Sequence, residues 1–158
     1  MKKNYLSEVL IISEEKKSDF TNVLLDVAAT SGWVNLEPAV DDDRKEELSG
    51  MFAWFSARGP KVPIGTVVSE SDSRFISIGL SHGLGRDASS VLQQAGLHPP
   101  EEWILRQEHP KRGFVWEIEA EKVAVNGIAD FLMGSTFELC LSSDTGVREW
   151  IVSVNRLD

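Results

Sequence analysis

From Arg74 onward the apolar residues switch between two spacings, one typical of strands and one typical of helices. Strand-like runs occupy residues 74–80, 103–107, 114–118 and 150–154, and helix-like runs occupy residues 88–95 and about 121–133. The turn-rich segment 108–113 joins the second and third strand-like runs as a hairpin. The order of these elements is therefore β-α-β-β-α-β.

This order predicts an α+β fold of the ferredoxin-like βαββαβ type over about residues 74–156, with an antiparallel sheet that carries both helices on one face. The other face of such a sheet needs a cover. Two N-terminal segments could supply one. Apolar residues recur at helical spacing from Phe20 to Ala28. They do so again from Leu48 to Phe55, after three aspartates, Asp41–Asp43, that suit the start of a helix. We therefore predict two additional N-terminal helices packed against the sheet. Residues Val9–Ile12 fit either a strand or the start of a helix.

The size of the chain predicts one domain. Its 158 residues are enough to bury a core without disulfides, and the roughly 60 N-terminal residues would form a poor core alone. We expect a mainly helical part at 1–60 and an α/β part at 62–158. No apolar run approaches the roughly 20 residues that a membrane span needs. The single cysteine, Cys140, is typical of a reducing compartment, so we expect a cytoplasmic protein with no membrane contact.

Charge limits the partners. The chain has 16 basic and 25 acidic residues and a net charge of −9, which repels nucleic acid and anionic membranes. Residues 74–118 are an exception, because they hold five basic and five acidic residues and all the histidines. If this protein binds a small anionic ligand, we expect it in that block.

A glycine-rich turn stands between the predicted strand 74–80 and the predicted helix 88–95. Gly83, Gly85 and Ala88 satisfy the pattern G-x-G-x-x-A, which in dinucleotide-binding folds brings backbone N–H groups close to a pyrophosphate. The hairpin that follows leaves no room for the parallel sheet of those folds, so we predict no cofactor. A phosphate or carboxylate held by the turn and Arg86 is the alternative to a purely structural turn.

The tip of the predicted hairpin carries a second group of basic side chains. If the two loops converge, they form one candidate anion site, although hairpin tips are commonly polar because they are wet. The candidate ligand-binding residues are His82, Gly83, Gly85, Arg86, His109, Lys111 and Arg112.

The segment Lys111–Trp116 resembles the RNA-recognition signature K/R-G-F/Y-G/A-F-V, and it falls on the third strand of the predicted order, as that signature does. The resemblance implies that Phe114 and Trp116 stack on bases. Val115 replaces the small residue and Glu117 the valine, and the protein is acidic, so we do not expect nucleic acid as a partner.

The sequence contains no catalytic or metal-binding pattern. The three histidines have no i, i+4 pair, there is no second cysteine, and no serine lies in a G-x-S-x-G elbow. We therefore predict a non-enzymatic interaction or binding module, with a protein partner or self-association. The alternative is a phosphate- or carboxylate-binding protein or enzyme, with its site at the Gly83–Asp87 turn and the His109–Arg112 hairpin.

Overall fold

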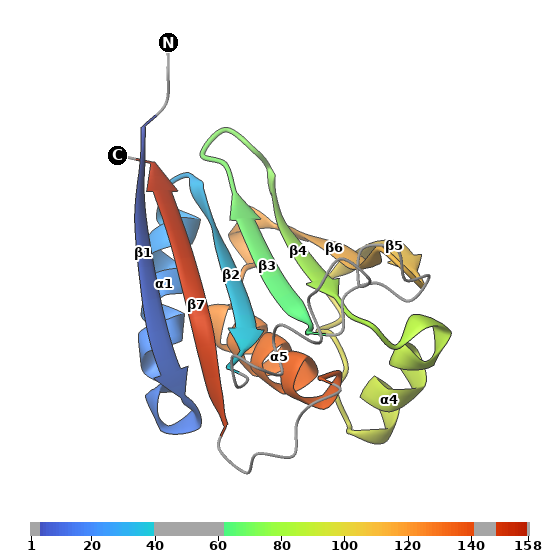
Figure 1. The fold of residues 1–158 in the computed structure, drawn as a ribbon. Coiled ribbons are helices and arrows are strands. Elements are labelled where there is room, and N and C mark those ends of the chain that lie inside the picture. The colour runs from blue at the N-terminus through green and yellow to red at the C-terminus, as the bar shows by residue number, and fades with distance from the viewer. Residues whose placement is uncertain (1–3, 40–61, 141–147, 158) are drawn as a thin grey trace.

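The computed structural model describes residues 4–39, 62–140 and 148–157 (Figure 1). Its helices and strands, in chain order, are β1 (Tyr5–Ser13), α1 (Lys17–Ala29), β2 (Gly32–Pro38), β3 (Ile64–Ser69), β4 (Phe75–Ser81), α4 (Ala88–Gln94), β5 (Ile104–His109), β6 (Gly113–Glu119), α5 (Val125–Glu138) and β7 (Glu149–Leu157). Short 3-10 turns, η1 (Glu14–Lys16), η2 (Gly85–Asp87) and η3 (Ala120–Lys122), precede the three helices.

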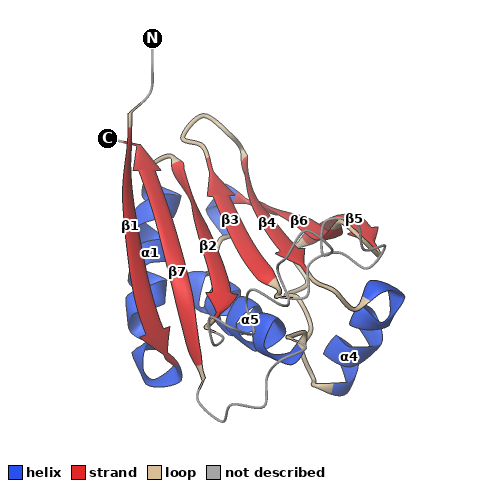
Figure 2. Cartoon of the chain, in the orientation of Figure 1, coloured by secondary structure: helices blue, strands red, loops and turns tan. Residues whose placement is uncertain are grey.

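The described strands form one antiparallel sheet in the order β1-β7-β2-β3-β4-β6-β5 (Figure 2). The chain begins at one edge of this sheet with β1. The last strand, β7, then lies between β1 and β2, so it separates two strands that are close in sequence. The β5–β6 hairpin forms the opposite edge.

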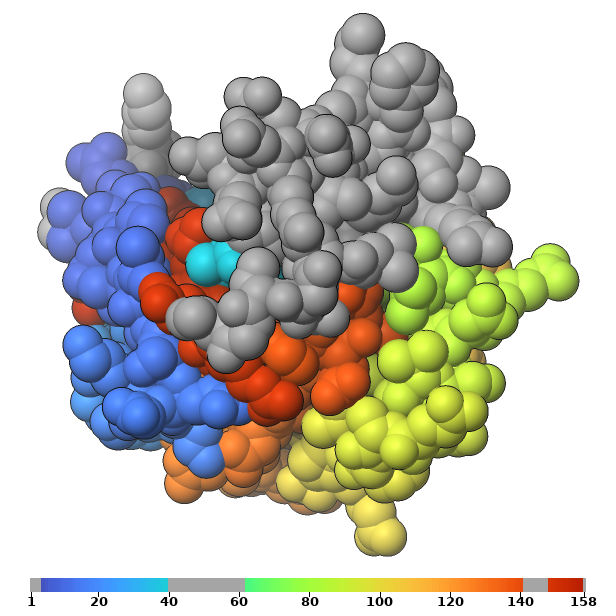
Figure 3. All heavy atoms as spheres, turned by 60° about the horizontal axis from the view of Figure 1, so that its bottom comes forward, coloured from blue at the N-terminus to red at the C-terminus, as the bar shows by residue number. Residues whose placement is uncertain are grey.

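The helices lie on one face of the sheet. α1 contacts α5, β2 and β3, while α5 also contacts α4. In Figure 1 the sheet is seen from the face that α1 and α5 do not cover, and Figure 3 shows α1, α5 and α4 following one another across the lower surface. We call the uncovered side the open face. The sheet therefore has one face in the core and one face that the described helices leave open.

The alternation of buried side chains follows directly from this arrangement. In β2, Val34 and Leu36 are buried under the helices, whereas Trp33 and Asn35 lie half-buried on the open face. The same alternation runs through β3, β4, β6 and β7. α5 closes the core with its buried residues Ile128, Ala129, Phe131, Leu132, Met133, Ser135 and Thr136.

The ferredoxin-like prediction for residues 74–156 is wrong. The neighbours β4, β6 and β5 lie as that fold requires, but its fourth strand should lie beside β4, and β7 lies instead between β1 and β2. β2 and β3 occupy the space between β7 and β4 because β2 pairs with both β3 and β7. Non-local strand pairing, which local periodicity does not report, produces this difference.

The predicted N-terminal cover of the sheet is also wrong in its first half. Residues 1–60 contribute strands β1 and β2, and α1 packs on the same face as α5 rather than on the other face. Gly32, four residues beyond the predicted helical pattern, begins β2 and lies against β7. The predicted helix over residues 41–55 lies outside the described residues.

The remaining predicted elements are confirmed. The structure contains the helices α1, α4 and α5, the strands β4 and β7, and the β5–β6 hairpin at the positions that the sequence indicates. The ambiguous run Val9–Ile12 is part of a strand, β1.

Candidate functional site

The two loops of the predicted anion site lie next to each other. Gly113, at the end of the hairpin turn, packs so closely on β4 that a Cβ atom there would lie 2.2 Å from the backbone oxygen of Leu80. On the other side, Ser89 at the start of α4 donates a hydrogen bond to Glu108 at the end of β5. The hairpin tip and the glycine turn therefore share one corner of the sheet.

The first predicted ligand-binding histidine points into the protein. His82 is 1% exposed, and its ring lies 5.4 Å from the ring of Phe114. Its Nδ1 accepts a hydrogen bond of 3.3 Å from the backbone N–H of Leu84. Burial lowers the pKa of the His82 imidazole, because the surroundings disfavour its charged form. His82 therefore holds the glycine turn as a neutral ring and does not face a ligand.

The second histidine shapes the hairpin. Nδ1 of His109 accepts hydrogen bonds from the backbone N–H groups of Lys111 and Arg112, each 3.1 Å long. The side chains of Lys111 and Arg112 are exposed, as is that of Arg86 in η2. Of the predicted anion-binding side chains, the three cationic ones therefore remain accessible, and the two histidines support turns.

The glycines of the G-x-G-x-x-A pattern have a conformational role. Gly85 has φ of 60°, in the left-handed region that favours glycine, and it begins η2. Gly83 is buried beside His82. The helix that follows, α4, is seven residues long and leads to an antiparallel hairpin. This geometry differs from the strand-turn-helix unit of a parallel dinucleotide-binding sheet.

Phe114 and Trp116 do not form a surface for stacking bases. Both are buried on the helix side of the sheet, where their rings stack 5.2 Å apart. Trp103 and Phe131 contact Trp116 edge-on at 5.7 and 5.3 Å. The resemblance of Lys111–Trp116 to the RNA-recognition signature therefore reflects an aromatic core, and the implied stacking role is wrong.

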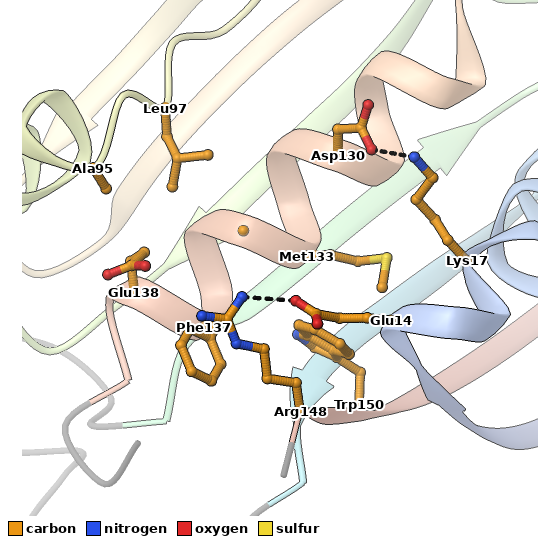
Figure 4. A pocket seen from close by; sticks show the side chains of 11 residues that line it. Glu14, Lys17, Ala95, Leu97, Asp130, Met133, Phe137, Glu138, Arg148 and Trp150 are labelled. Carbon is orange, nitrogen blue, oxygen red and sulfur yellow. Dashed lines mark hydrogen bonds and ion pairs between the residues drawn. The ribbon is translucent and has the colours of Figure 1, made fainter. Parts of the chain in front are cut away.

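A pocket of about 340 Å³ lies on the helix side, between η1, α5 and the start of β7 (Figure 4). Met133, Phe137 and Trp150 supply its apolar surface. Both of its basic groups are already paired, Lys17 with Asp130 and Arg148 with Glu14. The guanidinium carbon of Arg148 also lies 4.0 Å from the centre of the Phe137 ring. Among the described residues, the pocket therefore offers no unpaired cation to an anionic ligand.

A second pocket, of about 400 Å³, lies on the open face. Its polar lining is mostly uncharged, and Oγ1 of Thr66 donates a 2.9 Å hydrogen bond to Oδ1 of Asn35 within it. Glu37 is the charged residue of this lining, so the pocket also does not favour an anion. The lining residues are Asn35, Glu37, Ile64, Thr66, Ser81, Ile151 and Ser153.

The two edges of the sheet differ in how they are protected. β5 is six residues long, is interrupted by an irregularity between Leu105 and Gln107, and carries Arg106, Glu108 and His109. β1 is nine residues long, pairs with β7 without a register shift and contains neither proline nor a basic residue. Short length, bulges and charges are the features by which natural sheets avoid pairing at their edges. β5 has all three features, whereas β1 is long and has no bulge, and its one charged residue is Glu8.

Within the part of the chain that the structure describes, no strand lies on the outer side of β1. The hydrogen bonds of β7 show which backbone groups of β1 point to that side. The N–H of Leu157 bonds to Ser31, and the C=O of Glu149 accepts from Ala39, so the odd-numbered residues of β7 bond on the β2 side. Its even-numbered residues therefore bond to β1, and the register pairs them with even-numbered residues of β1. The outward N–H and C=O groups belong to Tyr5, Ser7, Val9, Ile11 and Ser13.

The side chains of these outward residues lie on the open face. Along a strand, the side on which the backbone N–H and C=O groups point and the face on which the side chain lies both alternate from one residue to the next. Val9 is 67% exposed and Ile11 is 65% exposed, the two highest values among the exposed large apolar residues. We call Ser7, Val9, Ile11 and Ser13 the open edge. The sequence reasoning missed it. Two features of the sequence could have indicated it. Val9, Ile11 and Ile12 are β-branched, and the alternate residues 5, 7, 9, 11 and 13 are all uncharged.

Metal binding finds no support in the geometry: among residues 4–39, 62–140 and 148–157 no cluster of histidine, cysteine, aspartate and glutamate side chains could hold an ion. Within the same ranges no helix has the length and apolar character needed to cross a membrane. The chain matches no family model, no curated protein and no solved structure.

Proposed function

We propose that this protein is a non-enzymatic interaction module that binds an extended strand of a protein partner along the open edge of β1. The single observation that carries the proposal is the contrast between the two sheet edges. A strand with a row of outward N–H and C=O groups, flanked by exposed Val9 and Ile11, is a template for an added strand. The backbone supplies the hydrogen bonds, and the two apolar side chains supply the buried area.

The chemistry of the open edge indicates the kind of segment that fits it. Ser7, Val9, Ile11 and Ser13 are all uncharged, and the charged residue of β1, Glu8, is already paired with Arg156 at 3.0 Å. A partner strand therefore needs apolar side chains on the face that it shares with Val9 and Ile11, and it needs no particular charge. This is recognition by strand addition, in which specificity comes from alternate side chains.

A labelled peptide with the sequence of residues 4–14 of this chain is a suitable strand probe, because it has the β propensity and alternation that the edge requires. We expect it to bind, as measured by fluorescence anisotropy. The matched variant is Val9→Pro, which removes an outward N–H and leaves the bonds from β1 to β7 in place. It should weaken binding by roughly tenfold or more.

The control for this experiment is Ile104→Lys, on the opposite edge, which should bind the peptide as the unmodified protein does. Circular dichroism should first establish that Val9→Pro keeps the fold. Absence of peptide binding at the highest soluble protein concentration, or equal binding by Val9→Pro, contradicts the proposal.

A second candidate function is the binding of a small anion by Arg86, Lys111 and Arg112. The close approach of the two loops favours it, because it brings the three exposed cationic residues to one corner of the sheet. Thermal unfolding with and without inorganic phosphate tests this candidate. A ligand at 100 times its Kd adds about 2.7 kcal/mol, and Arg86→Ala should remove most of the resulting shift in Tm. An equal shift in Arg86→Ala excludes the site.

We also propose that the module works in the cytoplasm. Cys140, the single cysteine of the chain, is 6% exposed, as expected for a protein that does not rely on disulfides. Cell fractionation tests the location, and recovery from a secreted or membrane fraction contradicts it.

A further inference from the structure

The charges along β1 limit how the open edge could pair with a second copy of itself. Antiparallel pairing of β1 with β1 about a two-fold axis can place any one residue opposite itself. Centring the pair on Glu8 places two glutamates opposite each other, and centring it on Ile11 places Glu8 opposite Glu14. Like charges directly opposite destabilise a pair of strands. Of the four registers centred on the middle of the strand, from Glu8 to Ile11, those centred on Val9 and on Leu10 remain.

Burial of apolar side chains distinguishes these two registers. With Val9 at the centre, Ile11 lies opposite Ser7 of the second copy. With Leu10 at the centre, Val9 lies opposite Ile11 of the second copy, and the same contact occurs twice because of the two-fold axis. The four most exposed apolar side chains then form two neighbouring cross-strand pairs on the open face. The Leu10-centred register therefore buries the larger apolar area.

The net charge of −9 does not oppose this contact locally. Arg156 pairs with both Glu8 and Asp26, at 3.0 and 3.1 Å, next to the open edge. Arg148 pairs with Glu14 at the far end of β1. The acidic side chains nearest the edge thus have basic partners within the same chain. Glu8 would lie opposite Ile12 of the second copy and is paired with Arg156, and the residues of the open edge are uncharged.

We propose that two copies of this chain associate through β1 in the Leu10-centred antiparallel register, which joins their sheets into one continuous sheet. The inference rests on the proposed function, since it names a second copy as the strand that the open edge receives. Residues 7–13 of each copy pair, and the outward groups form about eight backbone hydrogen bonds. The helices of both copies lie on the same face of the joined sheet. This contact is smaller than a standard interface of about 1,600 Å², so the dimer dissociates on dilution.

Sedimentation velocity of the full chain over a concentration series measures the association. Ile11→Lys places two lysines in the paired region of the dimer and should raise the dissociation constant by roughly tenfold or more. Ile104→Lys makes the same change on the protected β5 edge and should leave the dissociation constant unchanged. A dimer that Ile11→Lys does not weaken, or that Ile104→Lys weakens as strongly, overturns the proposal.

The register has its own test, which uses cysteine pairs. In the proposed arrangement Leu10 faces Leu10 of the second copy as a non-hydrogen-bonded pair, with Cα atoms about 4.5 Å apart, within the range of a disulfide. In the presence of oxidised glutathione, the Leu10→Cys variant should form a disulfide-linked dimer. The Val9→Cys variant should form much less of this covalent dimer. The unmodified protein, with its buried Cys140, is the baseline. Faster cross-linking of Val9→Cys than of Leu10→Cys overturns the register.

Failure of this inference can be distinguished from failure of the proposed function. If the chain remains monomeric at every concentration but binds the labelled 4–14 peptide, self-association is wrong and the open edge serves a different protein. If the chain neither associates nor binds the peptide, both the inference and the proposed function are wrong. A concentration-dependent dimer with the Leu10→Cys cross-link supports both.

Discussion

The indole Nε1 of Trp150 donates a hydrogen bond of 3.0 Å to the hydroxyl of Thr136, and this bond joins β7 to α5 inside the core. Trp150 is 2% exposed and Thr136 is fully buried. The Thr136 hydroxyl in turn donates to the backbone oxygen of Leu132, at 2.7 Å. The Thr136 hydroxyl therefore accepts a hydrogen bond from the buried indole N–H and donates one to the backbone of its own helix.

Thr136→Val should destabilise the protein by about 1–3 kcal/mol, because it leaves the buried indole N–H of Trp150 without an acceptor while it nearly preserves the volume. Urea denaturation followed by tryptophan fluorescence measures the free energy of unfolding. Thr136→Ser keeps the hydroxyl and should cost clearly less. Equal free energies of unfolding for the valine variant and the unmodified protein would show that the bond contributes nothing.

The neighbouring Ser135 should behave in the opposite way. Its side chain is fully buried, and within the described part of the chain its Oγ has no hydrogen-bond partner. Ser135→Ala removes this hydroxyl, so the free energy of unfolding should stay the same or rise by about 1 kcal/mol. The same urea experiment measures it. A loss of stability comparable with that of Thr136→Val would mean that Ser135 has a partner.

His82 should make the stability depend on pH. Burial lowers its folded-state pKa below the ordinary value of 6.5, so between the two pKa values the unfolded chain binds a proton that the folded chain does not. The contribution of His82 to the free energy of unfolding is therefore constant above pH 6.5. It falls as the pH drops from 6.5 to the lower pKa of the folded state. Thermal unfolding at about pH 7.5 and about pH 5.5 should show a lower Tm at the acidic value.

The variant His82→Gln tests the assignment, because glutamine keeps an acceptor near the Leu84 N–H and does not titrate. Its Tm should change less between the two pH values than that of the unmodified protein. His98→Gln, at an exposed histidine, is the control and should keep the full pH dependence. The assignment is wrong if His82→Gln retains the whole acidic loss.

Two glycines with similar backbone angles should respond differently to alanine. Gly113 has φ of 82°, and an added Cβ would lie 2.2 Å from the backbone oxygen of Leu80. Gly96 has φ of 73° and open space around the same position. Gly96→Ala should cost only the left-handed strain of about 1–2 kcal/mol, whereas Gly113→Ala should cost more because β4 and β6 must also separate. Urea denaturation measures both, and equal costs would contradict the close approach.

Local periodicity was sufficient for the elements with a clear pattern, such as α4 and the β5–β6 hairpin. It was insufficient for β2, where Trp33 and Val34 are consecutive and Gly32 also fits the end of a helix. The order of the sheet depends on the pairing of β7 with β1 and β2, and residues as far apart as Tyr5 and Leu157 leave no local trace of that pairing. This is why the predicted ferredoxin-like arrangement failed.

The candidate sites also depend on features that a local pattern does not report. The sequence singled out two loops that lie next to each other in the structure. It could not indicate that His82 is buried, because a histidine next to glycines gives the same pattern whether it points outward or inward. The sequence allowed a strand at Val9–Ile12 but did not indicate an open edge, because that depends on β1 being the last described strand on its side of the sheet. A strand's position in a sheet is a tertiary property.

The position of β7 between β1 and β2 also affects how the protein is made. β7 is the last of these strands to leave the ribosome, and until it arrives β1 has no neighbour in the sheet. During synthesis β1 is therefore an apolar strand with both edges unpaired, and it must wait for a partner more than a hundred residues away, which is a slow kind of contact to form. Before β7 is made, β1 is therefore the strand most exposed to pairing with another molecule.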